Sequence, residues 1–140
     1  MSPGNAVQAA IYQRLSGYSA LTSLVQGVYD FVPEDAQPPF VVIGDDTLTT
    51  SDDKTANAWE ATLTIHAWDF ERTGRKSVKS ILSAIYDALH RQEASLTVAG
   101  FTLVEIVHEF EQTFQDAGVE GQNDRYYHGV QRYRALIEAN

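Results

Sequence analysis

The histidines are the residues of this sequence best suited to acid–base or metal chemistry. His66, His108 and His128 fall in segments that alternate apolar and polar residues, as strands do, and neighbouring strands can bring such residues together. Neither these three nor His90 belongs to a spacing such as H-E-x-x-H, and half-exposed positions on a sheet explain the three strand histidines more simply. A small metal-dependent hydrolase that uses the strand histidines with Glu105 or Glu109 is a remote alternative.

Two groups of acidic residues offer further chemistry. One polar stretch holds Asp45, Asp46, Asp52 and Asp53. It lacks the alternating ligands, central glycine and final glutamate of a calcium loop. The second group shares one edge of a predicted strand at even spacing and comprises Glu105, Glu109 and Glu111. Two of them could act as acid and base, but an ordinary solvent-facing strand has the same spacing.

Other catalytic signals are missing from the sequence. There is no G-x-S-x-G, no phosphate-binding G-x-x-x-x-G-K-[ST] and no cysteine, and the glycines do not form a dinucleotide fingerprint. We therefore predict that the protein is not an enzyme and has no catalytic, metal or cofactor site. The net charge of -9 also opposes tight binding to nucleic acid.

The basic residues concentrate at the start of one predicted helix, as Arg72, Arg75, Lys76 and Lys79. The acidic balance of the whole chain makes a phosphate partner unfavourable for this cluster. Most such clusters are simply hydrated, and if this one has a use, we expect an ion pair with an acidic loop of another subunit.

Periodicity and turn residues predict the elements that position these side chains. The spacing predicts helices over 3–16, 19–25 and 74–91, and strands over 28–31, 40–43, 59–68, 96–98, 101–110 and 126–137. Polar loops are expected over 45–57 and 115–124. Hairpin-connected strands with one crossing helix predict a single α+β domain over 1–140, a two-layer sandwich whose mostly antiparallel sheet carries helices on one face. We expect no signal peptide and no membrane span.

Several segments, in this order, resemble one protein family. They are GVYD at 27–30, VPEDA at 32–36, PPFVVIG at 38–44, TLTIHAW at 62–68, the helix over 76–90 and HGVQRYR at 128–134. Taken together, they resemble the tail-completion, or tail-terminator, proteins of long-tailed bacteriophages, prophages and gene transfer agents, over nearly the whole chain.

The resemblance implies a structural role without enzymatic activity. It implies a hexameric ring that caps the tail tube, ends tube polymerisation and forms the tail side of the head-tail junction. The implied partners are the tail tube protein and a head-tail connector or stopper, and DNA would pass through the ring without specific binding. The implied location is the virion or phage-like particle, assembled in the host bacterial cytoplasm. A connector or stopper protein of the neck is the alternative.

We expect the interfaces in the polar loops and the basic cluster, because loops can become ordered against neighbouring subunits. The residues expected there are Thr47, Leu48, Thr50, Asp52, Asp53, Lys54, Arg72, Arg75, Phe114, Gln115 and Asp116.

Overall fold

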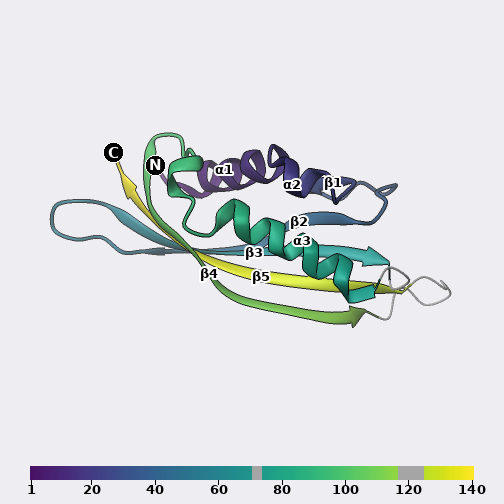
Figure 1. Ribbon diagram of the computed structural model, residues 1–140. Coiled ribbons are helices and arrows are strands. Elements are labelled where there is room, and N and C mark those ends of the chain that lie inside the picture. Colours follow the sequence, from purple (N-terminus) through teal and green to yellow (C-terminus); the bar gives the residue numbers. More distant parts are fainter. Residues whose placement is uncertain (71–73, 117–124) are drawn as a thin grey trace.

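Helices cover one face of a five-stranded sheet, and none of the helices in the described part of the chain lies on the other face (Figure 1). The computed structural model describes residues 1–70, 74–116 and 125–140. The strands are β1 (Gly27–Tyr29), β2 (Phe40–Thr50), β3 (Ala58–Phe70), β4 (Phe101–Asp116) and β5 (Tyr126–Ala139), and they lie in the order β1-β2-β3-β5-β4. Only the β1–β2 pair is parallel among these strands. The predicted α+β fold class is confirmed.

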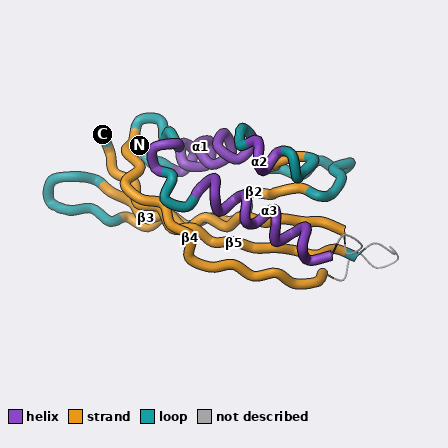
Figure 2. Tube along the Cα trace, in the orientation of Figure 1, coloured by secondary structure: helices purple, strands orange, loops and turns teal. Residues whose placement is uncertain are grey.

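The covering layer consists of α1 (Gly4–Ser16), the short α2 (Ser19–Thr22) and α3 (Gly74–Leu89), with a 3-10 turn at Glu93–Ser95 (Figure 2). α3 is amphipathic, and its apolar stripe of Val78, Ile81, Leu82, Ile85 and Leu89 is buried against the sheet. None of the helices in the described ranges has the length and apolar character needed to span a bilayer.

Gly129 sets how closely α3 approaches the sheet. A Cβ at this position of β5 would lie 2.7 Å from Cγ1 of Val78 and 2.8 Å from Cδ1 of Leu82. The missing side chain therefore lets these two residues pack directly on the β5 backbone. Buried polar groups beside them are paired, because Gln131 donates to the Leu82 carbonyl and accepts from the Tyr133 hydroxyl.

Three sequence predictions of local structure are wrong. The stretch from Asp45 is not wholly a loop, since β2 continues to Thr50 after a bulge between Ile43 and Asp46. Its threonines favour a strand, but solvent on both faces removes the apolar alternation that would predict one. The predicted strand at 96–98 is an irregular segment whose two apolar residues are buried in the core. β4 reaches Asp116, so the interface residues 114–116 lie in a strand, and 117–124 lie outside the described residues.

Candidate assembly interfaces

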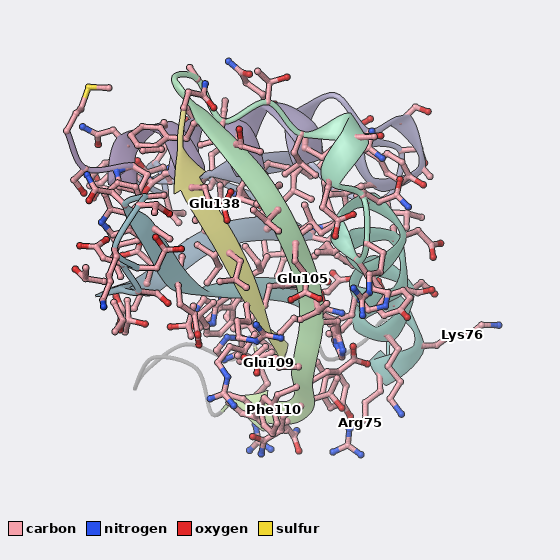
Figure 3. The ribbon with its side chains drawn as sticks, turned by 90° about the vertical axis from the view of Figure 1, so that its left-hand side faces the viewer. Arg75, Lys76, Glu105, Glu109, Phe110 and Glu138 are labelled. Atoms are coloured by element: carbon pink, nitrogen blue, oxygen red, sulfur yellow. The ribbon has the colours of Figure 1, made fainter. Side chains whose placement is uncertain are left out.

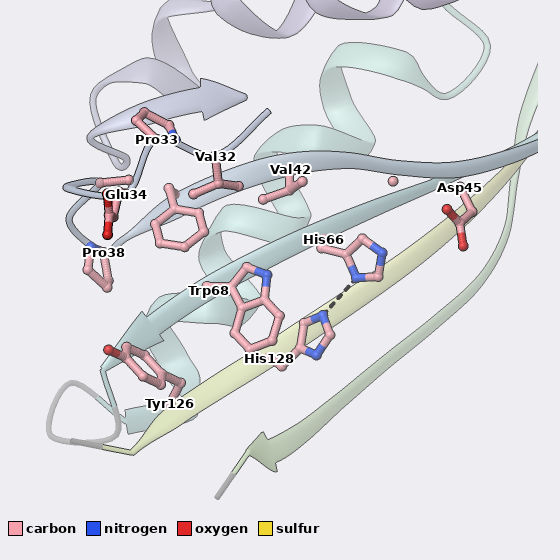
Figure 4. A pocket seen from close by; sticks show the side chains of 13 residues that line it. Val32, Pro33, Glu34, Pro38, Val42, Asp45, His66, Trp68, Tyr126 and His128 are labelled. Carbon is pink, nitrogen blue, oxygen red and sulfur yellow. Dashed lines mark hydrogen bonds between the residues drawn. The ribbon is translucent and has the colours of Figure 1, made fainter. Parts of the chain in front are cut away.

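The uncovered face of the sheet contains a cavity at the end where β3 finishes and β5 begins (Figure 4). The cavity measures about 710 Å³ and lies between the segment 32–38 and the open faces of β2, β3 and β5. Trp68 and Tyr126 form part of its wall, and the exposed carboxylates of Glu34 and Asp45 also line it. We call this cavity the aromatic pocket.

Two histidines form the floor of the aromatic pocket. Nδ1 of His66 lies 2.7 Å from Nε2 of His128, so one ring donates a hydrogen bond and the other accepts it. The indole of Trp68 stacks on His128 with ring centroids 3.7 Å apart, and Phe114 lies against the same ring at 4.6 Å. Burial lowers the pKa of His66 below its usual value, and the charge of Asp45 opposes this shift in part.

The third strand histidine lies elsewhere. His108 points to the helix-covered side, where it contacts the rings of Tyr86 and Tyr133, and its backbone N–H donates to Nδ1 of His90. The strands therefore bring together His66 and His128 only. Within residues 1–70, 74–116 and 125–140, no three His, Cys, Asp or Glu side chains gather as a metal site needs.

The glutamates of β4 do not share one face, and this prediction is wrong. A bulge between His108 and Phe110 shifts the alternation, so Glu111 reaches the helix-covered side and accepts from Gln131 at 2.7 Å. Glu105 and Glu109 stay near the open face. Figure 3 shows the two residues along β4, where they form ion pairs with arginines.

These ion pairs form a chain along β4 and β5. Glu105 lies 2.9 Å from Arg91 and 3.4 Å from Arg134. Glu109 lies 3.8 Å from Arg134 and 3.9 Å from Arg132. Both carboxylates therefore bind β4 to β5, and Glu105 also binds Arg91 just after α3, through contacts that solvent screens.

The β2–β3 hairpin projects beyond the helical layer as a two-stranded ribbon (Figure 1). We call residues 46–62 the ribbon. The predicted interface residues Thr47, Leu48 and Thr50 lie on its β2 strand, and all three are exposed. The hydroxyls of Thr47 and Thr62 meet across the two strands.

Two aspartates order the tip of the ribbon. Oδ1 of Asp53 accepts from the backbone N–H groups of Thr55 and Ala56 and from the Thr55 hydroxyl, at 2.7 to 2.8 Å. Oδ1 of Asp52 accepts from the Ala58 N–H at 3.0 Å. The bonds from Thr55, and then that from Ala56, lower the pKa of Asp53. The exposed tip, which also carries Lys54, is therefore a defined turn.

The structure describes only part of the basic cluster. Arg72 lies outside the described residues. Arg75 and Lys76 occupy the first turn of α3, both exposed, and that turn contains no acidic residue. The guanidinium of Arg75 lies 5.1 Å from the ring centre of Tyr127, and Lys76 extends into solvent (Figure 3).

The structure thus groups residues that sequence reasoning kept apart. Of the predicted interface residues, Phe114 adjoins the aromatic pocket, Gln115 is exposed near the end of β4, and Asp116 ends that strand. The sequence does not predict Glu34, Trp68 or Tyr126 as interface residues. The alternation of β3 and β5 carries a signal for the two aromatic residues, since it places Trp68 on the same face as His66, and Tyr126 on the same face as His128.

Comparison with known proteins gives consistent matches. The family model for tail completion protein gp17 matches residues 9–138. Tail completion protein gp17 of Bacillus phage SPP1 is 31% identical over 99 residues, which is 71% of this chain and 71% of that protein. A chain in the virion of a native gene transfer agent particle superposes with a TM-score of 0.83 at 25% identity, covering 99% of this chain and 98% of that one. The structure of bacteriophage SPP1 gp17 superposes with a TM-score of 0.57 at 26% identity, covering 94% and 88%.

The matches and the fold define the class first: a structural protein of tailed phages and gene transfer agent particles. Within that class, the chain belongs to the family of tail completion protein gp17.

Proposed function

We propose that this tail completion protein assembles as a hexameric ring that caps the tail tube, ends tube polymerisation and forms the tail side of the head-tail junction. The observation that carries the proposal is the full-length similarity to a chain of the gene transfer agent virion, with a TM-score of 0.83 over 99% of this chain. A similarity of this extent includes the helical layer and the sheet together, rather than a shared motif.

The ribbon is the element we assign to the tail tube. Its β2 strand is exposed from Asp46 to Thr50, and its tip is held by the bonds of Asp52 and Asp53. A preordered projection loses little conformational entropy when it binds, which favours docking onto a repeating tube end. Thr47, Leu48, Thr50 and Lys54 are the side chains it offers.

The acidic balance of the chain suits a ring through which DNA passes. With 19 acidic and 10 basic residues, a lining drawn from the acidic surface would repel the phosphate backbone and prevent specific binding. A neutral or basic lining would contradict this part of the proposal. On the head side, the ring would contact a connector or stopper. In this proposal the protein catalyses no reaction. It joins the particle in the host bacterial cytoplasm.

Addition of the purified protein to polymerising tail tubes tests the function. We expect tubes that stop growing and carry one ring at one end, visible by electron microscopy, and a ring mass of six subunits. Tubes that grow equally with and without the protein would contradict capping. Binding to the head-side vertex instead of the tube would assign the protein to the connectors or stoppers.

A further inference from the structure

The aromatic pocket has the composition of a site for a basic side chain. Its carboxylates, Glu34 and Asp45, are exposed, and neither has an ion-pair partner among the described residues. The indole of Trp68 and the phenol of Tyr126 line the pocket together with the apolar side chains of Val32, Pro38 and Val42 (Figure 4). Aromatic faces beside carboxylates attract a lysine or arginine, whose aliphatic stem can pack on the apolar surface.

The first turn of α3 has the complementary charge. The N-terminal end of a helix is the positive end of its dipole, and acidic residues are favoured there. α3 has Arg75 and Lys76 in that turn and no acidic residue. No carboxylate in the described ranges lies within ion-pair distance of either cation. Carboxylates of another subunit would supply the ion-pair partners that the two cations lack among the described residues.

The two features lie at the same end of the sandwich but on opposite faces of the sheet. Ser77 of α3 donates to the carboxylate of Asp69 on the helix-covered face, and the next residue back, Trp68, lines the pocket on the open face. Arg75 stacks on Tyr127, and Tyr126, the residue before Tyr127 in the chain, lines the pocket. The thickness of the sheet therefore separates the cations from the pocket of their own chain.

A second copy brings the cations and the pocket together when the helix-covered face of one copy packs on the open face of the next. We propose that the first turn of α3 in one copy docks Arg75 and Lys76 into the aromatic pocket of the next copy, between Glu34 and Asp45. Such a contact uses two different patches, so it repeats from copy to copy and closes a ring when the rotation allows. The inference rests on the proposed ring and names the contact between its subunits.

Cysteine crosslinking tests the contact directly, because the chain has no cysteine of its own. The double variant Glu34→Cys/Lys76→Cys is bound to tail tubes and, separately, concentrated in solution, and both samples are oxidised and run on a denaturing gel. A head-to-tail contact gives a ladder of covalent oligomers up to the ring size. The matched control is Glu138→Cys/Lys76→Cys, whose first site is exposed near the end of β5, and it gives no ladder.

The outcomes separate this inference from the proposed function. A capped tube without crosslinks in the Glu34→Cys/Lys76→Cys variant overturns the contact and leaves the capping function intact. Crosslinked dimers without longer species mean a symmetric pair and overturn the head-to-tail arrangement. If the wild-type protein leaves tubes uncapped, the proposed function fails, and the concentrated sample then decides the contact alone.

Charge reversal provides a second measurement that does not depend on disulfide geometry. Glu34→Lys/Asp45→Lys and Arg75→Glu/Lys76→Glu should each weaken subunit association by about 10-fold or more, since like charges then face each other. An equal mixture of the two variants should restore association, because each altered pocket then meets an altered helix of opposite charge. Loss of capping by the pocket variant without rescue in the mixture would assign the pocket to a basic segment of another protein and overturn the proposal.

Discussion

Gly44 makes room for the histidine pair of the aromatic pocket. A Cβ at this position would stand 2.6 Å from Nε2 and 2.7 Å from Cδ2 of His66. We expect Gly44→Ala to lower the free energy of unfolding by about 1–3 kcal/mol, because the ring must leave His128 or the strand must shift. Urea unfolding measures the change. Gly4→Ala is the control, since its Cβ meets only Ser2 Oγ at 4.0 Å, and equal losses in both variants would contradict the prediction.

His66 makes stability depend on pH. Burial lowers its pKa from 6.5, so the unfolded chain takes up the proton first, and the free energy of unfolding falls as the pH drops below about 6.5. The loss levels off below the native pKa, where the folded protein is protonated too. Asp45 and His128 face the same ring.

Unfolding curves between pH 8 and pH 5 test this dependence. The wild-type protein should lose more stability across this range than His66→Gln, which has no proton to take up at this position. NMR titration of the His66 ring should give a midpoint below 6.5. Parallel stability curves for the two proteins would show that His66 does not contribute.

At the scale of the element, the tip of the ribbon depends on one carboxylate. The lowered pKa of Asp53 means that its bonds to Thr55 and Ala56 persist above the ordinary value of 3.8 and are lost as the pH falls through the lower native value. We expect Asp53→Ala to speed amide exchange at Thr55 and Ala56 at neutral pH. Asp53→Asn should keep the protection of these amides from exchange and make that protection independent of pH, since the amide oxygen still accepts.

Exchange measured by NMR distinguishes these cases. Asp46→Ala, on the exposed strand of the same ribbon, should leave the tip unchanged. Unchanged exchange at Thr55 and Ala56 in Asp53→Ala would show that the turn is held by its backbone alone.

At the scale of the whole molecule, the tip of the ribbon, residues 52–57, should be separable from the fold. Trp59 packs on Phe101 and must remain. Among the described residues, the one backbone hydrogen bond that joins residues 52–57 to a segment outside the hairpin runs from Ala139 N–H to the Asn57 carbonyl. Replacing 52–57 with Asn-Gly closes β2 to β3 by a two-residue turn. We expect stability within about 1 kcal/mol of wild type.

The same shortened protein should bind tail tubes much more weakly. Co-sedimentation with purified tubes measures the loss, and Lys54→Ala serves as the control that alters one tip side chain while keeping the turn. A shortened protein that caps tubes as the wild type does would move the tube contact to another surface.

The sequence by itself determined much of the architecture, because helical and strand periodicities record which side of each element is buried. Val78 to Leu89 predicted the covering helix, the alternation from Trp59 to Trp68 predicted the central strand, and the ordered segments predicted the family. The ribbon strand after Asp45 escaped prediction, since exposure on both faces leaves no apolar pattern.

Tertiary structure decided which side chains meet. Strand order places β5 between β3 and β4, so His66 and His128 become neighbours although 62 residues separate them in the chain. A bulge after His108 moves Glu111 away from Glu105 and Glu109. The packing of α3 on the sheet places the first turn of α3 at the same end of the molecule as the aromatic pocket. Pairing order and bulges arise from contacts between distant segments, and no local pattern of residues contains them.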